Sequence, residues 1–147
     1  MHIPVVIVDD EEIDRLIALK RISRSPWAKV LNPVFEAISG DVFLDTLFQT
    51  DALPEGQKLV LMDINMPGRS GFETIEEMRR RMPTEGDGTV VIVYSSSENE
   101  DDVARAKALD LVREYIVKPF DEADIETIVR VFDLKSPETA PDGTLLH

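Results

Sequence analysis

Polar side chains directly follow four apolar runs of this chain. They are Asp9 and Asp10 after the first run, then Asp63, then Ser95, and finally Lys118. An unbroken apolar run of four or five residues is typical of a strand buried on both faces of a parallel sheet. Because ligands bind beyond the carboxyl ends of such strands, and these ends share one edge, we expect the five side chains to lie together.

Three carboxylates at one point need a compensating positive charge. Two carboxylates about 5 Å apart repel by roughly 3 kcal/mol at an effective dielectric near 20. Lys118 would offset part of this repulsion, and a hard divalent cation would offset the rest. Mg²⁺ binds one or two carboxylates together with water and phosphate oxygens. The candidate ligands are Asp9, Asp10, Asp63 and the backbone carbonyl of Asn65.

A carboxylate beside Mg²⁺ is also a candidate nucleophile, because it can form an aspartyl phosphate. Asp63 is the candidate acceptor, since it ends the run that we expect to be a central strand. Ser95 could donate a hydrogen bond to a phosphoryl oxygen, and Lys118 could pair with its charge. Taken singly, these acids and serines could cap helices, and the lysine could be an ordinary surface residue. Their joint placement favours the site.

Five apolar strands alternate with helical patterns along the chain. Strands are expected at residues 5–8, 34–37, 59–62, 90–94 and 114–117, and helices at 13–24, 42–48, 72–81, 99–111 and 121–134. This alternation predicts an α/β fold, a doubly wound five-stranded parallel sheet with helices on both faces, of the (βα)5 flavodoxin-like type. We expect one domain over residues 1–135 and a mobile tail over 136–147, which has two prolines and no periodicity.

The first helix is expected to begin an apolar face with Ile13, Leu16 and Ile17. Its outer face would then be basic, with Arg15, Lys20, Arg21 and Arg24.

Composition narrows the classes of partner. The chain has 16 Lys+Arg against 29 Asp+Glu, a formal charge of -13, so its surface would repel nucleic acid. It has no cysteine, which excludes disulfides and thiolate metal sites. No apolar run reaches membrane-spanning length, and no signal peptide is recognisable at the N-terminus. We therefore expect a cytoplasmic protein that contacts neither nucleic acid nor membranes.

Four motifs together resemble the receiver domain of two-component response regulators. The resemblance spans residues 3–134, and its specificity comes from the order and spacing of the motifs. They are Val8-Asp9-Asp10, Asp63-Ile64-Asn65-Met66-Pro67-Gly68 with Gly71, Tyr94-Ser95-Ser96, and Tyr115-Ile116-Val117-Lys118-Pro119-Phe120.

The resemblance implies a role for each site residue. Asp63 would be the phosphoacceptor, Asp9 and Asp10 would hold Mg²⁺, and Lys118 would contact the phosphoryl group. Ser95 would be the switch hydroxyl, and Tyr115 the switch aromatic, which in the family turns inward when the hydroxyl engages the phosphate. The plainer interpretation of Tyr115 is a rim aromatic that packs on a helix.

The chain departs from the family pattern at several places, and two of them bear on the site and on the expected output face. Ser95-Ser96 replaces the frequent Thr-Ala, and this leaves open which serine of 95–97 engages the phosphoryl group. Leu111-Val112 stands where many relatives have Gly-Ala.

The resemblance also implies a signalling protein and not an enzyme with a substrate of its own. The donor would be a histidine kinase or a histidine phosphotransfer protein. The 147 residues leave no room for an attached effector domain, so we expect a stand-alone receiver that binds an output protein. A phosphorelay intermediate and a phosphate sink remain open.

Two further functions fit the architecture less well. A phosphohydrolase with an aspartyl nucleophile resembles an Asp-x-Asp arrangement, but Asn65 stands two residues after Asp63 and cannot supply a proton. A flavodoxin-like cofactor binder needs a phosphate-cradling loop after the first strand. Here that loop is the acidic segment 9–12, which would repel phosphate unless a metal intervened.

Overall fold

A five-stranded parallel sheet forms the centre of the computed structural model, which describes residues 2–48, 52–53, 56–82 and 88–137. The strand order is β2-β1-β3-β4-β5. β2 is therefore added on one side of β1, and β3, β4 and β5 follow on the other side. The strands are β1 (Val5–Val8), β2 (Val34–Ala37), β3 (Lys58–Met62), β4 (Thr89–Ser95) and β5 (Val112–Val117). The predicted doubly wound sheet is confirmed, with β5 beginning two residues earlier than expected.

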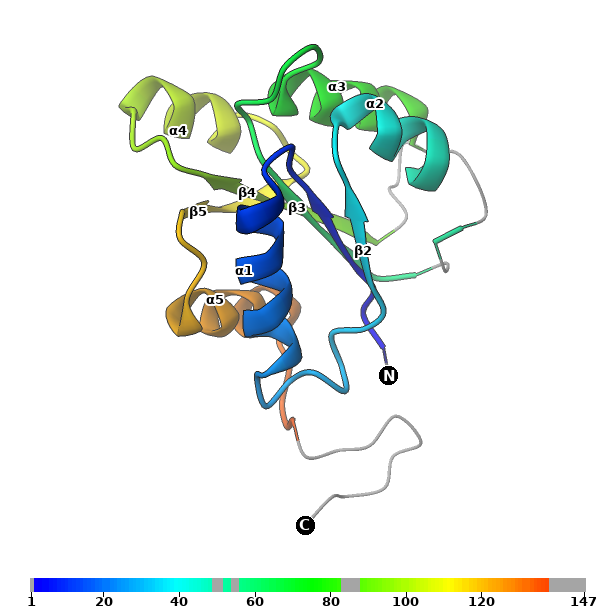
Figure 1. Ribbon diagram of the computed structural model, residues 1–147, viewed down its shortest axis with the longest axis vertical. Coiled ribbons are helices and arrows are strands. Elements are labelled where there is room, and N and C mark those ends of the chain that lie inside the picture. Colours follow the sequence, from blue (N-terminus) through cyan, green and yellow to red (C-terminus); the bar gives the residue numbers. More distant parts are fainter. Residues whose placement is uncertain (1, 49–51, 54–55, 83–87, 138–147) are drawn as a thin grey trace.

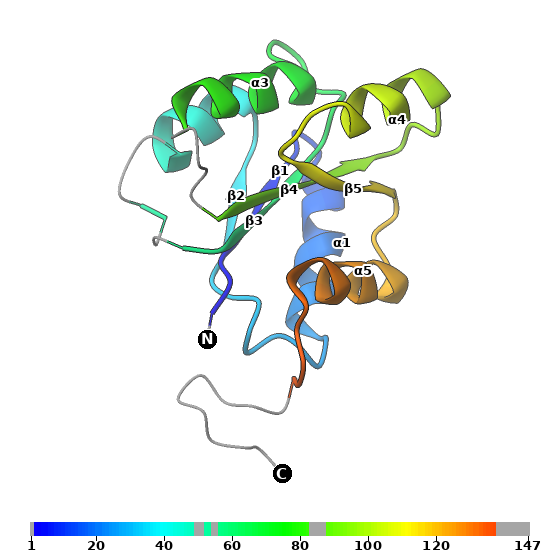
Figure 2. The same cartoon turned by 180° about the vertical axis from the view of Figure 1, so that it is seen from behind.

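Helices cover both faces of the sheet. They are α1 (Glu12–Ser23), α2 (Gly40–Val42) continued by η1 (Phe43–Phe48), α3 (Gly71–Arg81), α4 (Glu100–Lys107) and α5 (Glu122–Phe132). Figures 1 and 2 show α1 and α5 on one face and α2, α3 and α4 on the other. Helix α4 is shorter than the predicted 99–111, because Ala108 is already its C-cap.

The pleat of the strands divides the apolar residues between two cores. Val5 and Ile7 of β1 belong to the cluster that α1 and α5 cover, whereas Val6 and Val8 belong to the cluster beneath α3 and η1. All four side chains are fully buried. A strand that is apolar on both faces is thus explained by helices on both sides.

The hydrogen-bonded ladder continues past the strand ends and fixes the polar residues beyond them. The amide of Asp9 donates to Ala37 O at 3.0 Å, and the amide of Asp63 donates to Val8 O at 3.0 Å. On the other side of the sheet, the amide of Lys118 donates to Ser95 O at 2.8 Å. The backbone of the site is therefore held by the sheet.

Helix α1 differs from its prediction in the face that it buries. Ile13 and Leu16 are 71% and 43% exposed, while Ala18 and Ile22 are fully buried. The expected apolar face is wrong for Ile13 and Leu16, because β1 ends at Val8 and the helix begins beyond the sheet edge, whereas Ile17 packs against the core. Arg15 is not part of an outer basic face either: its Nη1 donates to Asp9 O at 2.8 Å.

Some predictions fall on residues that the structure does not describe. They are most of the tail, residues 138–147. Within the described residues, no helix is both long enough and apolar enough to cross a membrane.

Candidate functional site

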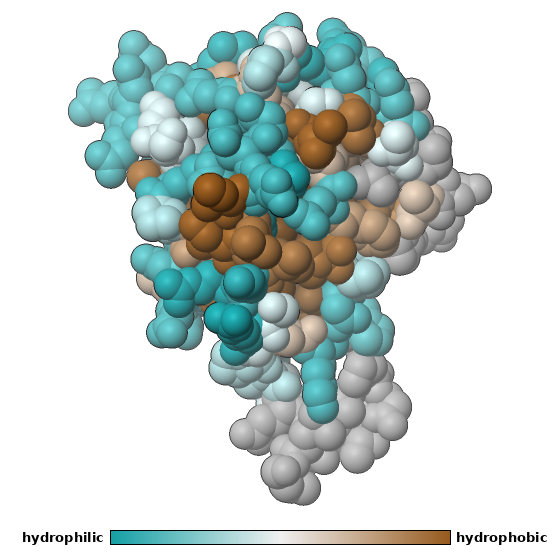
Figure 3. All heavy atoms as spheres, viewed as in Figure 1, coloured by the Kyte–Doolittle hydropathy of each residue, from teal (hydrophilic) through white to brown (hydrophobic). Residues whose placement is uncertain are grey.

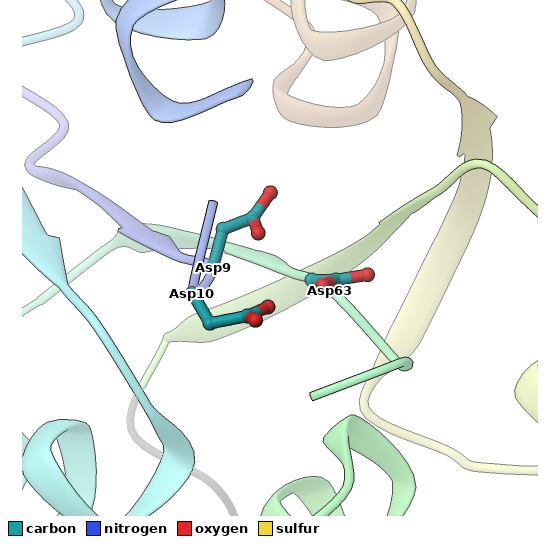
Figure 4. Close-up of side chains that lie close together, drawn as sticks. All are labelled: Asp9, Asp10 and Asp63. Carbon is teal, nitrogen blue, oxygen red and sulfur yellow. The ribbon is translucent and has the colours of Figure 1, made fainter. Parts of the chain in front are cut away.

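Three aspartates converge at the carboxyl edge of the sheet. Asp9, Asp10 and Asp63 each offer a carboxylate oxygen, and these atoms lie within 4.8 Å of one another. Figure 4 shows them at the ends of β1 and β3, the two neighbouring central strands. Asp9 is fully buried and Asp63 is 3% exposed. The predicted acidic cluster therefore exists, in a largely dehydrated setting.

Local backbone geometry fixes two of the three carboxylates. Asp9 Oδ1 accepts a hydrogen bond from the amide of Glu11 at 2.9 Å, and Asp63 Oδ1 accepts one from the amide of Asn65 at 3.3 Å. The segment after Asp63 also packs closely on the start of α3. A Cβ atom at Gly71 would lie 2.2 Å from the backbone oxygen of Asp63, so only glycine fits there.

Lys118 supplies the positive charge of the site. Its Nζ lies 2.7 Å from Asp9 Oδ2, 2.9 Å from Asp14 Oδ2 and 3.7 Å from Asp63 Oδ1. It also sits 4.9 Å from the centre of the Tyr94 ring. Burial alone lowers the pKa of Lys118, but the contacts with Asp9 and Asp14 outweigh it and the pKa is raised. The side chain is therefore a permanent cation.

The single positive charge of Lys118 does not neutralise the negative charge of the clustered aspartates. Burial raises the pKa of Asp63 from 3.8 to about 7, against the opposing charge of Lys118 and with a further increase from Asp9. Without another cation, a proton on Asp63 thus relieves the excess negative charge.

Two carboxylate oxygens lack a directed partner among the described residues. Asp10 Oδ1 is buried and accepts no hydrogen bond. Asp9 Oδ2 also accepts none with hydrogen-bond geometry, although Lys118 Nζ is 2.7 Å away. Buried polar atoms without partners are costly, so these two oxygens mark a position that suits a bound cation. Hard oxygen donors suit Mg²⁺, and the donor set fits that ion.

The three serines after β4 have different surroundings. Ser95 is fully buried, and its Oγ accepts a hydrogen bond from the amide of Ser97 at 3.1 Å. The Ser97 hydroxyl donates to Asp102 Oδ2 at 2.7 Å, so it is already engaged at the start of α4. Ser96 is exposed. These contacts favour Ser95 as the hydroxyl of the site, because it directly ends the strand next to β3.

Tyr115 connects β5 to the segment after Ser95. The side chain is half-buried and packs against the core cluster beneath α3. Its hydroxyl donates to Ser97 O at 2.8 Å. The side chain therefore combines the packing role with a polar contact to the β4–α4 connection.

The sequence patterns did not single out Asp14, Arg15 or Tyr94 as part of this arrangement. Asp14 pairs with Lys118, Arg15 binds the carbonyl of Asp9, and the Tyr94 hydroxyl donates to Asp14 O at 3.1 Å.

Comparison with known proteins identifies the family of the chain. A family model described as response regulator receiver domain matches residues 5–130. The nitrate/nitrite response regulator protein NarL of Escherichia coli (strain K12) is 31% identical over 102 residues, covering 69% of this chain and 42% of that protein. A protein-glutamate methylesterase/protein-glutamine glutaminase of Desulfitobacterium hafniense is 31% identical over 131 residues, covering 87% of this chain and 30% of that protein.

A solved two-component response regulator from Cytophaga hutchinsonii superimposes with a TM-score of 0.78 at 23% identity, covering 92% of this chain and all of that one. At this identity the likeness establishes the fold alone. The chain spans about half, or less, of the length of the curated relatives that it matches. The family model, which covers most of the chain, shows that the chain belongs to the response regulator receiver domain family.

Proposed function

We propose that the chain accepts a phosphoryl group on Asp63, with Mg²⁺ as cofactor, and signals through contacts with other proteins. Receiver domains are generally signalling proteins, and the family membership supports this general role. The observation that carries the proposal is the buried cluster of Asp9, Asp10 and Asp63 beside the Lys118 ammonium.

Each group has a distinct task in this proposal. Asp9, Asp10 and Asp63, with the carbonyl of Asn65, would hold Mg²⁺, which neutralises charge on the transferring phosphoryl group. The Asp63 carboxylate is the nucleophile, and Lys118 pairs with a phosphoryl oxygen once the group is attached.

The donor in this proposal is a histidine kinase or a histidine phosphotransfer protein. We propose that the receiver acts as a single-domain regulator over residues 1–135, in the cytoplasm, and passes its signal to an output protein. Relay and phosphate-sink roles use the same chemistry on Asp63 and differ only in the fate of the phosphoryl group after its transfer.

Output requires an element that changes when Asp63 carries a phosphoryl group. In this proposal Ser95 donates to that group. Its Oγ accepts from the amide of Ser97, whose carbonyl in turn accepts from the Tyr115 hydroxyl. A movement of Ser95 would therefore alter the hydrogen bonds of the β4–α4 connection and of the Tyr115 hydroxyl. We propose that the output protein docks on α4, β5 and α5, and that phosphorylation shifts an existing equilibrium on that face.

NMR shift mapping with Mg²⁺ and beryllofluoride, a phosphoryl mimic, tests this proposal. We expect shifts at Asp63 and also along α4, β5 and α5. Ser95→Ala and Tyr115→Ala should each keep the shifts at the acidic cluster and reduce the distant ones. Shifts confined to the cluster in the parent protein would refute the coupling, and no shifts at all would refute the phosphoacceptor site.

A further inference from the structure

Lys118 contacts three acids, and one of them, Asp14, lies outside the proposed acidic cluster. Asp9 and Asp63 belong to the acidic cluster, but the second-shortest contact of the ammonium, 2.9 Å, is to Asp14 of α1. This contact is a directed hydrogen bond from Nζ to Oδ2. Asp63 is the most distant of the three acids, at 3.7 Å. The ammonium is thus held nearer to α1 than to the proposed acceptor.

Asp14 is itself fixed in place by the core. Its backbone carbonyl accepts a hydrogen bond from the Tyr94 hydroxyl at 3.1 Å, and Tyr94 is fully buried. The Tyr94 ring meets Phe120 edge-on at 6.0 Å between centroids, and Lys118 Nζ lies 4.9 Å from the Tyr94 ring centre. The side chain of Asp14 is 29% exposed, while its main chain is anchored by the Tyr94 hydroxyl.

We propose that Asp14 is a positioning residue, an anion that holds Lys118 toward α1 and away from Asp63. The inference rests on the proposed function and adds a residue to the machinery of that site. Because Lys118 Nζ lies 2.7 Å from Asp9 Oδ2, the ammonium competes with any divalent cation for this oxygen. Asp14 weakens that competition by offering the ammonium an alternative partner.

The same anion has the opposite effect on a phosphoryl group. Negative charge on Asp14 repels an anion attached at Asp63, and the hydrogen bond to Asp14 retains the ammonium that this anion needs. Asp14 therefore favours the metal and disfavours the phosphoryl group. A substitution that merely damaged the fold would weaken both, so the opposite signs identify the positioning role.

The variant Asp14→Asn removes the charge and keeps the shape of the side chain. Calorimetric titration should show Mg²⁺ binding weakened by roughly 3- to 10-fold, since a nearby charge is lost and the ammonium moves toward the cluster. Titration with beryllofluoride, at Mg²⁺ saturating for each variant and followed by NMR, should show tighter binding by a similar factor.

Two variants serve as controls. Glu12→Gln removes one negative charge from an exposed position in the same helical turn, with no contact to Lys118 among the described residues, and should change either affinity by less than about twofold. Asp14→Glu restores the anion and should return both affinities toward those of the parent.

The outcomes separate this inference from the proposed function. If the parent binds Mg²⁺ and beryllofluoride, and Asp14→Asn weakens both or changes neither, Asp14 has no positioning role. If Glu12→Gln changes both affinities as much as Asp14→Asn does, the effect comes from net charge and not from the contact with Lys118. That result would also overturn the inference. If the parent binds neither probe, the proposed function fails and the positioning role fails with it.

Discussion

At the scale of single residues, close backbone packing places the proposed acceptor. A Cβ atom at Gly71 would meet Asp63 O at 2.2 Å and Ile64 Cα at 2.6 Å, and neither backbone atom can move aside cheaply. We predict that Gly71→Ala costs roughly 2–4 kcal/mol of folding stability and weakens Mg²⁺ binding. Chemical denaturation and calorimetric titration measure the two effects.

Gly68 in the same connection is the matched control. A Cβ atom there would meet no atom within 4 Å, but the backbone has a φ of +75°. Gly68→Ala should therefore cost only about 1–2 kcal/mol, from the left-handed backbone alone. Equal losses for the two variants would mean that the contact between Gly71 and Asp63 does not position the site.

The protonation of Asp63 gives a second prediction at this scale. Its pKa is raised from 3.8 to about 7, mainly by burial, so the folded protein binds a proton more tightly than the unfolded chain. This contribution to stability is present at low pH and is lost as the pH rises from about 4 to 7. Without divalent cations, Asp63→Asn should raise the melting temperature by several degrees at pH 8 and by less at pH 5. A pH-independent difference would contradict the raised pKa.

Spacing alone was enough to predict the cluster residues, because parallel strands bring their carboxyl ends together. The strand runs before Asp9, Asp63, Ser95 and Lys118 carried this information. The Asp14–Lys118 pair joins positions 104 residues apart. It depends on how α1 packs beside the sheet, which no local pattern encodes.

At the scale of elements, the start of α1 exposes two apolar side chains beside the site. Ile13 and Leu16 are 71% and 43% exposed, and Ile13 precedes Asp14, which touches Lys118. Figure 3 shows apolar surface gathered over α1 in the view of Figure 1. Exposed apolar side chains next to a reactive group are suited to contact a protein donor.

We predict that Ile13→Ser slows phosphoryl transfer from a phosphorylated histidine phosphotransfer protein by about tenfold, the loss of more than 1 kcal/mol that marks an anchor residue of an interface. Labelling by acetyl phosphate should be unchanged, since a small donor needs no docking surface. Stability should change by less than about 0.5 kcal/mol, because the side chain is exposed. If Ile13→Ser slowed phosphorylation equally with the phosphotransfer protein and with acetyl phosphate, Ile13 would act at the phosphorylation site and not in docking.

The error in the predicted face of α1 has a physical cause at this scale. Helical periodicity identifies apolar positions, but it does not say where the supporting sheet ends. Ala18 and Ile22 lie over the sheet and are buried, whereas Ile13 lies beyond the last residue of β1. By contrast, α3 and α5 bury apolar residues at helical spacing, Ile75 and Met78 in one and Ile125 and Ile128 in the other.

At the scale of the whole molecule, a bound cation should stabilise the fold by mass action. A ligand at ten times its dissociation constant adds about 1.4 kcal/mol, which corresponds to roughly 3–6 °C for a domain of this size. We predict such a rise in melting temperature with Mg²⁺ and its near loss in Asp10→Asn, whose parent carboxylate has a buried oxygen without a partner. An unchanged melting temperature across millimolar Mg²⁺ would count against the site.

The global fold was predictable because strands and helices alternate with clear boundaries, and that alternation permits few topologies. The order β2-β1-β3-β4-β5 matches the doubly wound arrangement expected from it. The limits of α4 were less predictable, since Leu109 and Leu111 extend the apolar pattern beyond the last helical residue, Lys107.

The central claim is that Asp63 accepts the phosphoryl group. The most direct test is to incubate the protein with acetyl phosphate and Mg²⁺, and to locate the label by mass spectrometry of the intact protein and its peptides. We predict one phosphoryl group on Asp63, no labelling without Mg²⁺, and none in Asp63→Asn. Labelling of Asp63→Asn to the level of the parent would contradict the account.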